Sequence, residues 1–214
     1  MRIQLESAVA GSYAPTRIVL LPAAYTAPED FIREGFLRCA RGRQVDLALA
    51  EVNLQHVSDR TILRRLRHEA VLPARAVGCT SVWMCGISLG GFLALAYAER
   101  YPTEVDGLCL LAPCLGNRIV TGEIERAGGI LAWEPGEVAP DDDERRVWRF
   151  IKTHRERSLV LHLGFGSEDR FAASHRMMAA ALAPEAVDER PGAHDWPVWR
   201  ELWENFLDHR LRGA

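Results

Sequence analysis

Long apolar runs, paired cysteines and blocks of like charge are missing from this 214-residue sequence, and each absence excludes a class of protein. No run of about 18 apolar residues occurs, and the segment Met1–Glu6 lacks the apolar stretch of a signal peptide, so membrane spanning and secretion are disfavoured. Charges of both signs are spread along the chain and sum to only −3 at pH 7. This balance argues against nucleic acid as a partner.

The cysteines do not form the pattern of a disulfide framework or of a metal site. Their number is odd, no CxxC pair occurs, and most of them lie inside apolar runs. We therefore expect reduced core residues in a cytoplasmic protein. The five cysteines are Cys39, Cys79, Cys85, Cys109 and Cys114.

A metal ion or other cofactor is not predicted either. The three consecutive aspartates Asp141–Asp143 are the only dense acidic group, and neither a histidine nor a further carboxylate stands at ligand spacing from them. Carboxylates are stabilising in the first turn of a helix, so we expect this group to begin a solvated helix.

The remaining composition is that of a globular protein with a large core. Hydrophobic residues make up 48% of the chain and charged residues 26%. A chain of this length buries roughly 70% of its extended surface when it folds as one domain. We therefore expect residues 1–214 to form a single domain that needs no disulfide or metal for stability.

Short apolar runs recur along the chain and resemble strands that are buried on both faces of a sheet. Stretches with apolar residues at helical spacing lie between them, and the clearest is the last, with its stripe from Trp199 to Leu207. This alternation predicts a doubly wound α/β domain whose mainly parallel sheet carries helices on both faces. The expected strands are Arg17–Pro22, Val45–Val52, Ser81–Ile87, Val105–Ala112, Ser158–Leu163 and, with a weaker pattern, Ala186–Arg190.

One stretch, at about residues 115–143, interrupts the alternation with glycines and prolines before a helix expected near Glu144–His154. Its length is that of a short lid or substrate loop and is too small for a second domain.

The pentapeptide Gly86–Gly90 reads G-x-S-x-G, with Ser88 at its centre. It stands between the strand Ser81–Cys85 and the apolar helix Phe92–Glu99, which is the setting of a nucleophilic serine at the tip of a strained turn. Side chains at Gly86 or Gly90 would collide with the neighbouring strand or helix. The motif and its context therefore predict Ser88 as a nucleophile.

A serine nucleophile needs a base and a carboxylate that orients the base. Among seven histidines, His194 differs because it lies in a loop between the last strand and the last helix, at the sheet edge from which it can reach Ser88. The loop after the strand Ser158–Leu163 supplies Asp169 as the orienting acid, with its neighbour Glu168 as the alternative. Asp195 is expected to cap the last helix instead. His162, inside a strand, is expected as a core histidine with its hydrogen bonds satisfied. The other histidines are expected at surface or boundary positions: His56, His68, His154, His175 and His209.

Ser88, Asp169 and His194 occur in the order nucleophile, acid, base. In this order and setting the chain resembles the α/β-hydrolases, in particular the small serine esterases, over nearly its whole length. Only about sixteen residues precede the strand Arg17–Pro22, so the resemblance implies that the first antiparallel strands of larger members are missing or shortened.

The resemblance also implies an oxyanion hole made of backbone N–H groups. One comes from Leu89, directly after the nucleophile, and the other from the loop after the strand Arg17–Pro22, where Ala24 matches by position and Tyr25 is the near alternative. Many members carry a His-Gly pair in this loop, whereas this chain has the sequence Leu-Pro-Ala-Ala-Tyr-Thr.

The chemistry implied is acyl transfer from a small-molecule carboxylic ester or thioester to water through an acyl-enzyme. An acyltransferase with the same triad and a non-catalytic binding protein on the same fold are the alternatives, and a homodimer stays open. Four aromatic residues near the loops are candidates for the lining of the substrate pocket: Tyr25, Trp133, Phe165 and Trp196.

Overall fold

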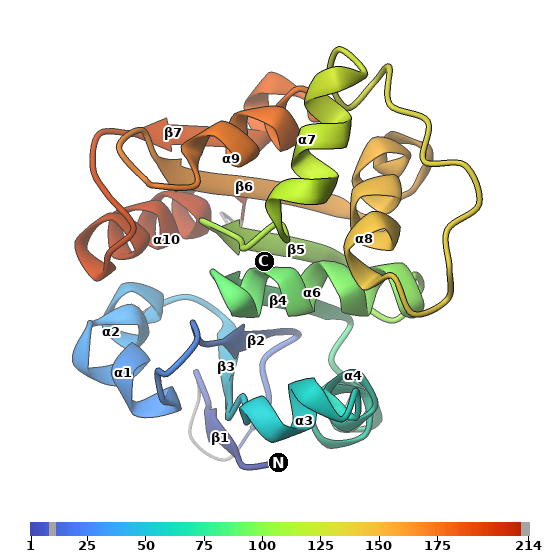
Figure 1. Cartoon of the computed structure of the whole chain (residues 1–214). Coiled ribbons are helices and arrows are strands. Elements are labelled where there is room, and N and C mark those ends of the chain that lie inside the picture. Colours follow the sequence, from blue (N-terminus) through green and yellow to red (C-terminus); the bar gives the residue numbers. More distant parts are fainter. Residues whose placement is uncertain (9–11, 211–214) are drawn as a thin grey trace.

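A seven-stranded sheet forms the centre of the molecule (Figure 1). The computed structural model describes residues 1–8 and 12–210. The strand order is β1-β3-β2-β4-β5-β6-β7; β1 pairs with β3 in the antiparallel sense and all other pairs are parallel. The strands are β1 (Ile3–Glu6), β2 (Thr16–Leu21), β3 (Val45–Ala50), β4 (Ser81–Ile87), β5 (Gly107–Leu111), β6 (Val160–Gly166) and β7 (Val187–Arg190).

Helices cover both faces of this sheet, which confirms the predicted doubly wound α/β class. α1, α2 and α10 pack together on one face, whereas α4, α6 and α8 pack together on the other (Figure 1). In the described residues no helix is both long and apolar enough to cross a membrane. The α-helices are α1 (Pro28–Arg33), α2 (Phe36–Ala40), α3 (Leu54–Ser58), α4 (Ile62–Leu66), α5 (Leu72–Ala76), α6 (Leu89–Arg100), α7 (Arg118–Arg126), α8 (Asp143–Lys152), α9 (Ala172–Ala179) and α10 (Trp196–Arg210).

All six predicted strands are present, and the largest change is in the bounds of β6. The apolar pattern predicted a strand over Ser158–Leu163, but β6 continues through two glycines to Gly166. Glycine has a low strand propensity, and here parallel pairing of Leu163–Gly166 with β7 holds the extended backbone. β1 was not predicted as an individual strand, since its four residues carry little apolar signal.

The apolar stripe of α10 packs onto the sheet as predicted. Trp199, Leu202, Trp203 and Phe206 are all buried, and Leu202 lies directly over Gly164 of β6, where a side chain would crowd it. Trp203 also donates a hydrogen bond from its indole N–H to the backbone oxygen of Phe36 and stacks on that ring. Burial of side chains of this size contributes about 1.5–3 kcal/mol each. These contacts fix the helix that follows His194.

His162 of β6 faces the same helix and is buried, as predicted, but neither ring nitrogen has a hydrogen-bond partner. Its ring lies 5.3 Å from that of Phe206. Burial lowers the pKa of His162 to about 4, because the charged form would lose its hydration; nearby Asp188 opposes this shift, whereas Arg210 and His209 add to it. The folded protein therefore holds a neutral imidazole that the unfolded chain protonates more readily.

We predict that His162→Leu weakens the loss of stability in acid. Because the pKa of His162 is about 4 in the folded state and 6.5 when unperturbed, unfolding takes up a proton in this window. The wild-type free energy of unfolding should thus fall as the pH drops from 7 to 4, by roughly 1–3 kcal/mol through this residue. Denaturant titrations at both pH values measure the fall. If the free energy of unfolding of His162→Leu falls as much as that of the wild type, His162 is not the source of the acid sensitivity. His68→Leu, at an exposed histidine, is the control and should behave like the wild type.

Candidate active site

Ser88 lies in a strained turn between β4 and α6. Its backbone angles are φ 50° and ψ −111°, in the left-handed half of conformational space that residues other than glycine seldom adopt. The turn closes tightly, because a Cβ at Gly86 would lie 2.2 Å from the backbone oxygen of Gly90, and one at Gly90 would lie 2.2 Å from that of Leu21. Both glycines are therefore required for the reason predicted from the sequence.

Hydrogen bonds from neighbouring loops hold this turn in place. The Ser88 N–H donates to the backbone oxygen of Leu111 at 3.0 Å, and the Ser88 carbonyl accepts from the N–H of Cys114 at 2.8 Å. The Ser88 residue is itself half-buried, at the surface of the sheet edge. Its backbone is thus fixed by the end of β5 while its hydroxyl remains accessible.

Asp169 and His194 meet at the same edge of the sheet. The Nδ1 atom of His194 lies 2.6 Å from Oδ2 of Asp169, and the other carboxylate oxygen of Asp169 accepts a hydrogen bond from the N–H of Phe171 at 2.8 Å. The Asp169 side chain is fully buried, while 13% of the His194 side chain is exposed. The pair therefore joins a buried acid to an imidazole that can reach a ligand.

The surroundings of Asp169 keep it ionised. Burial alone raises the pKa of this carboxyl, but the hydrogen bonds from His194 and from the Phe171 N–H outweigh it, so the pKa lies below its ordinary value. A carboxylate in this position orients the imidazole and stabilises the imidazolium that forms when His194 takes a proton. The two other acids considered lie elsewhere. Glu168 is exposed, and Asp195 accepts a hydrogen bond from the N–H of Val198 at the start of α10.

Two aromatic rings hold the imidazole of His194 from its sides. Phe171 and Trp199 each make an edge contact, with ring centroids 5.3 and 5.0 Å from that of His194. Across the described residues no hydrogen bond joins His194 to the Ser88 hydroxyl. Such bonds are often long in the absence of substrate and tighten as the reaction proceeds.

Residues 167–171 form the loop that carries Asp169 (the acid loop), and residues 191–195 form the loop that carries His194 (the base loop). A contact that the sequence did not predict holds these two loops together. A Cβ at Gly166 would lie 2.2 Å from the backbone oxygen of Gly192, and the N–H of Glu168 donates to that same oxygen at 2.9 Å. A glycine ending the strand before the acid, together with a glycine before the base, is the signal that could have indicated this approach.

The predicted oxyanion donors lie at the ends of two adjacent strands. Leu89 is the first residue of α6, and the close contact of Gly90 with the carbonyl of Leu21 brings this helix start against the loop that holds Ala24. Tyr25 adopts a positive φ of 61°, and its side chain is 93% exposed. The assignment of Leu89, Ala24 and Tyr25 to an oxyanion hole stays a prediction.

The structure separates the four aromatic residues predicted to line a substrate pocket. Trp133 and Phe165 are in the core, with 3% and 0% of their surface exposed, so a substrate would not reach them in this conformation. Phe165 is buried because it belongs to the inner strand β6, where its ring packs against that of His175. Trp196 is half-buried against Phe31, and Tyr25 is the exposed residue of the set.

His175 also differs from its expected place at a surface or boundary. It is fully buried beneath the acid loop, where Nε2 lies 2.9 Å from the backbone oxygen of Pro113 and the ring packs on Phe165. Burial lowers the pKa of His175, so the ring stays neutral beside the charged Asp169. The small residues around it on α9 gave no sign of this burial in the sequence.

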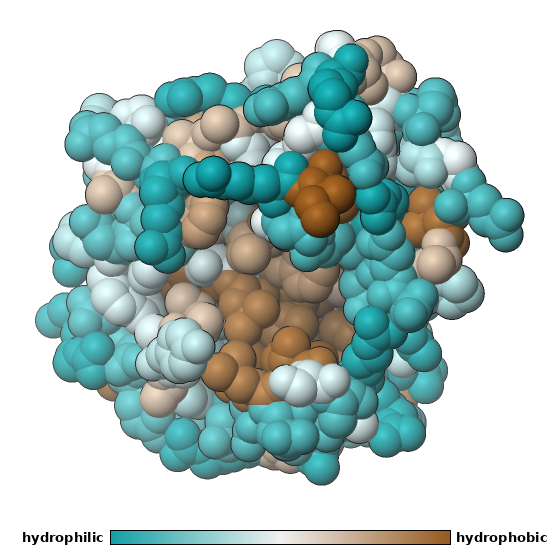
Figure 2. Space-filling view, in the orientation of Figure 1, coloured by the Kyte–Doolittle hydropathy of each residue, from teal (hydrophilic) through white to brown (hydrophobic). Residues whose placement is uncertain are grey.

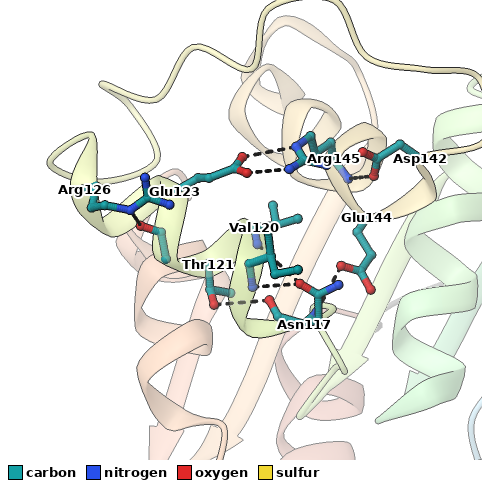
Figure 3. Close-up of polar contacts among 10 residues, drawn as sticks. Asn117, Val120, Thr121, Glu123, Arg126, Asp142, Glu144 and Arg145 are labelled. Carbon is teal, nitrogen blue, oxygen red and sulfur yellow. Dashed lines mark hydrogen bonds and ion pairs between the residues drawn. The ribbon is translucent and has the colours of Figure 1, made fainter.

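The stretch 115–143 contains α7 and is fastened to α8 (Figure 3). Arg145 of α8 pairs with Glu123 of α7 and with Asp142, which caps α8 in the solvated helix start predicted for the three aspartates. Glu144 accepts a hydrogen bond from the N–H of Asn117, the residue that caps α7. A function of this stretch as a lid or substrate loop stays a prediction.

Clefts open on both sides of the start of α7. One, of about 490 Å³, lies between α7 and α9 and is lined by Phe171, the ring that touches His194. The other, of about 580 Å³, has Phe92 of α6 and the residues Ile119 and Val120 of α7 in its wall. Figure 2 shows apolar surface in a hollow at the centre of the view, where Figure 1 places α6. Apolar surface thus lies on α6, the helix that begins next to Ser88, whereas the cleft beside Phe92 is otherwise lined mainly by charged residues of the segment 141–145.

Comparison with known proteins identifies relatives of this architecture. The family model described as serine aminopeptidase, S33, matches residues 69–156, which include the turn around Ser88. No curated protein matches the sequence.

Solved structures resemble nearly the whole chain at low sequence identity. The fluorophosphonate-binding serine hydrolase FphF of Staphylococcus aureus is 13% identical, with a TM-score of 0.65 over 95% of this chain and 86% of its own. Est1E from Butyrivibrio proteoclasticus is 16% identical, with a TM-score of 0.64 over 98% and 94%. The S-formylglutathione hydrolase FrmB of Staphylococcus aureus is 11% identical, with a TM-score of 0.62 over 92% and 81%. At these identities the likeness shows a common fold.

We predict that Gly166→Ala disrupts the contact between the acid and base loops. The added methyl group would meet the backbone oxygen of Gly192, which is not a flexible group, so the substitution should lower the free energy of unfolding by about 1–3 kcal/mol. Gly122→Ala is the matched control, because no atom lies within 4 Å of its added methyl and alanine favours the helix α7 by about 0.5–1 kcal/mol. Denaturant unfolding of both variants tests this, and a Gly166→Ala protein as stable as wild type would refute the contact.

Proposed function

We propose that this chain, which has the α/β-hydrolase fold and matches the serine aminopeptidase family model over residues 69–156, cleaves a carboxylic ester or thioester with Ser88 as the nucleophile, His194 as the base and Asp169 as the orienting acid. The observation that carries the proposal is the 2.6 Å contact between His194 and Asp169 at the sheet edge where Ser88 occupies its strained turn. This combination supplies an activated hydroxyl where a substrate can reach it.

The reaction proceeds in two halves. Ser88 attacks the carbonyl carbon while His194 accepts its proton, and the resulting oxyanion takes hydrogen bonds from the N–H of Leu89 and of Ala24, or Tyr25 in its place. His194 then returns the proton to the leaving alcohol or thiol. Water, activated in the same way by His194, releases the acid from Ser88.

The apolar surface in the hollow over α6 favours an acyl chain as the part of the substrate that binds next to Ser88. Phe92 of α6 lies one helical turn after Ser88 and lines a cleft with Ile119 of α7. Charged side chains, among them those of Asp141–Asp143 and Arg145, line much of the rest of this cleft, so an acyl group would contact the wall formed by α6 and α7. In this proposal the stretch 115–143 serves as a wall of the substrate site.

The cysteines support a cytoplasmic location as part of the proposal. All five are free thiols, and Cys85 and Cys109 are both fully buried. Thiols are kept reduced in the cytoplasm, whereas exported proteins more often pair them.

We predict that Asp169→Asn lowers kcat for p-nitrophenyl esters by about 10³–10⁴-fold, because an amide cannot hold the imidazole in the tautomer that accepts a proton from Ser88. Glu168→Gln is the matched control at the adjacent exposed position and should retain wild-type kcat. Initial rates with acyl chains of two to twelve carbons measure both values. Loss of activity in Glu168→Gln, with Asp169→Asn active, would overturn the assignment of the acid.

The acyl acceptor is tested with the same wild-type enzyme. In the proposed reaction the free acid is the product, and its yield should equal that of p-nitrophenol. If the acyl group is transferred to an added alcohol or amine in preference to water, the protein is an acyltransferase. If no ester or thioester is turned over, the result favours a non-catalytic binding protein.

A further inference from the structure

The cleft between α7 and α9 carries positive charge next to the catalytic base. Arg118 of α7 and Arg170 of the acid loop both line it, and neither forms an ion pair in residues 1–8 and 12–210. The guanidinium of Arg170 lies 4.8 Å from the centre of the Phe171 ring, and that ring touches His194. A direct path of contacts therefore leads from the imidazole to the arginine.

The cleft opens between the starts of two helices. The cleft is formed by the first turns of both helices, with Asn117 and Arg118 on one side and Phe171 and Ser174 on the other. Backbone N–H groups at both helix starts already donate within the chain, to the side chain of Asn117 at α7 and to Asp169 before α9, so the positive charge of the cleft comes from its side chains. Glu125 is the acidic residue in the lining, so the two arginines outweigh it.

These unpaired arginines contrast with two arginines of α8 that fasten this helix to α7 and to α6. Arg145 and Arg146 are both matched by carboxylates, to Glu123 and Glu99 (Figure 3 shows the first pair). Arginine in particular suits carboxylate recognition because its planar group presents several N–H donors. The guanidinium groups of Arg118 and Arg170, which have no carboxylate partner among the described residues, can thus bind an anion from outside the chain.

We propose that this cleft is an anion subsite and that the natural substrate is an ester or thioester bearing a carboxylate, which Arg118 and Arg170 bind while the reacting carbonyl lies at Ser88. The inference rests on the proposed hydrolase function and specifies its substrate class. A carboxylate on the acyl group and one on the leaving group share this chemistry, and the experiment separates them.

The test compares charged with neutral esters. Mono-p-nitrophenyl adipate carries the carboxylate on its acyl chain, 3-carboxy-4-nitrophenyl hexanoate carries it on the leaving group, and p-nitrophenyl hexanoate is the neutral reference. For each enzyme the ratio of kcat/KM for a charged ester to that for the reference is measured. The wild type should favour one charged ester, which identifies the side of the scissile bond that lies in the cleft.

Substitutions should change this ratio in opposite directions. Arg170→Gln and Arg118→Gln should each lower it by about three- to tenfold, the range expected for one partly solvated charge pair, and Arg170→Lys should restore part of the loss. Glu125→Gln should raise the ratio, because it removes the opposing charge. Arg126→Gln is the control at the far end of α7, outside the cleft, and should leave the ratio unchanged. Added salt should weaken the wild-type preference.

Two failures are distinguishable. If neutral and charged esters are both cleaved but neither arginine substitution lowers the ratio, the anion subsite is refuted while the hydrolase function stands. If no ester is cleaved and Ser88 takes no acyl group, the proposed function fails and the subsite falls with it.

Discussion

The parallel pairing of β4, β5, β6 and β7 is the constraint on which the site depends. Each strand enters the sheet in the same direction, so the residues that follow β4, β6 and β7 all emerge at one edge. Ser88, Asp169 and His194 are separated by up to 106 positions in the sequence, yet each lies within four residues of the end of one of these strands. Strand direction and order therefore bring the three predicted site residues to one edge of the sheet.

Close backbone contacts then convert a shared edge into a defined geometry. Gly90 lies against the carbonyl of Leu21 and Gly166 against that of Gly192, so the loops meet with no side chain between them. The strain of Ser88 at a positive φ is held by the hydrogen bonds of its own N–H and carbonyl to the end of β5 and the loop after it. Such a conformation costs of order 1–3 kcal/mol and persists where the surrounding structure fixes it.

The parts predictable from the sequence were those with a local signal. The G-x-S-x-G turn and the stripe of α10 depend on neighbours within a few residues, and their placement agrees with the structure. The contact of Asp169 with His194 followed from strand order, because both loops leave the same edge. Long-range packing was harder to predict: His175 has small and polar neighbours in the sequence but is buried under the acid loop, and Phe165 faces the core although it ends a strand near the site. Pairing with β7, which no local pattern shows, extended β6 to Gly166.

Modification of Ser88 by a fluorophosphonate tests the central claim, the activation of this serine by His194, most directly. Intact mass should show one adduct on the wild type and none on Ser88→Ala, and the rate of labelling should fall sharply in His194→Ala. The tryptic peptide between Arg75 and Arg100 contains both Ser81 and Ser88, so fragment ions must place the adduct at Ser88. An adduct on Ser81 or on another residue, or labelling that does not depend on His194, would contradict the claim.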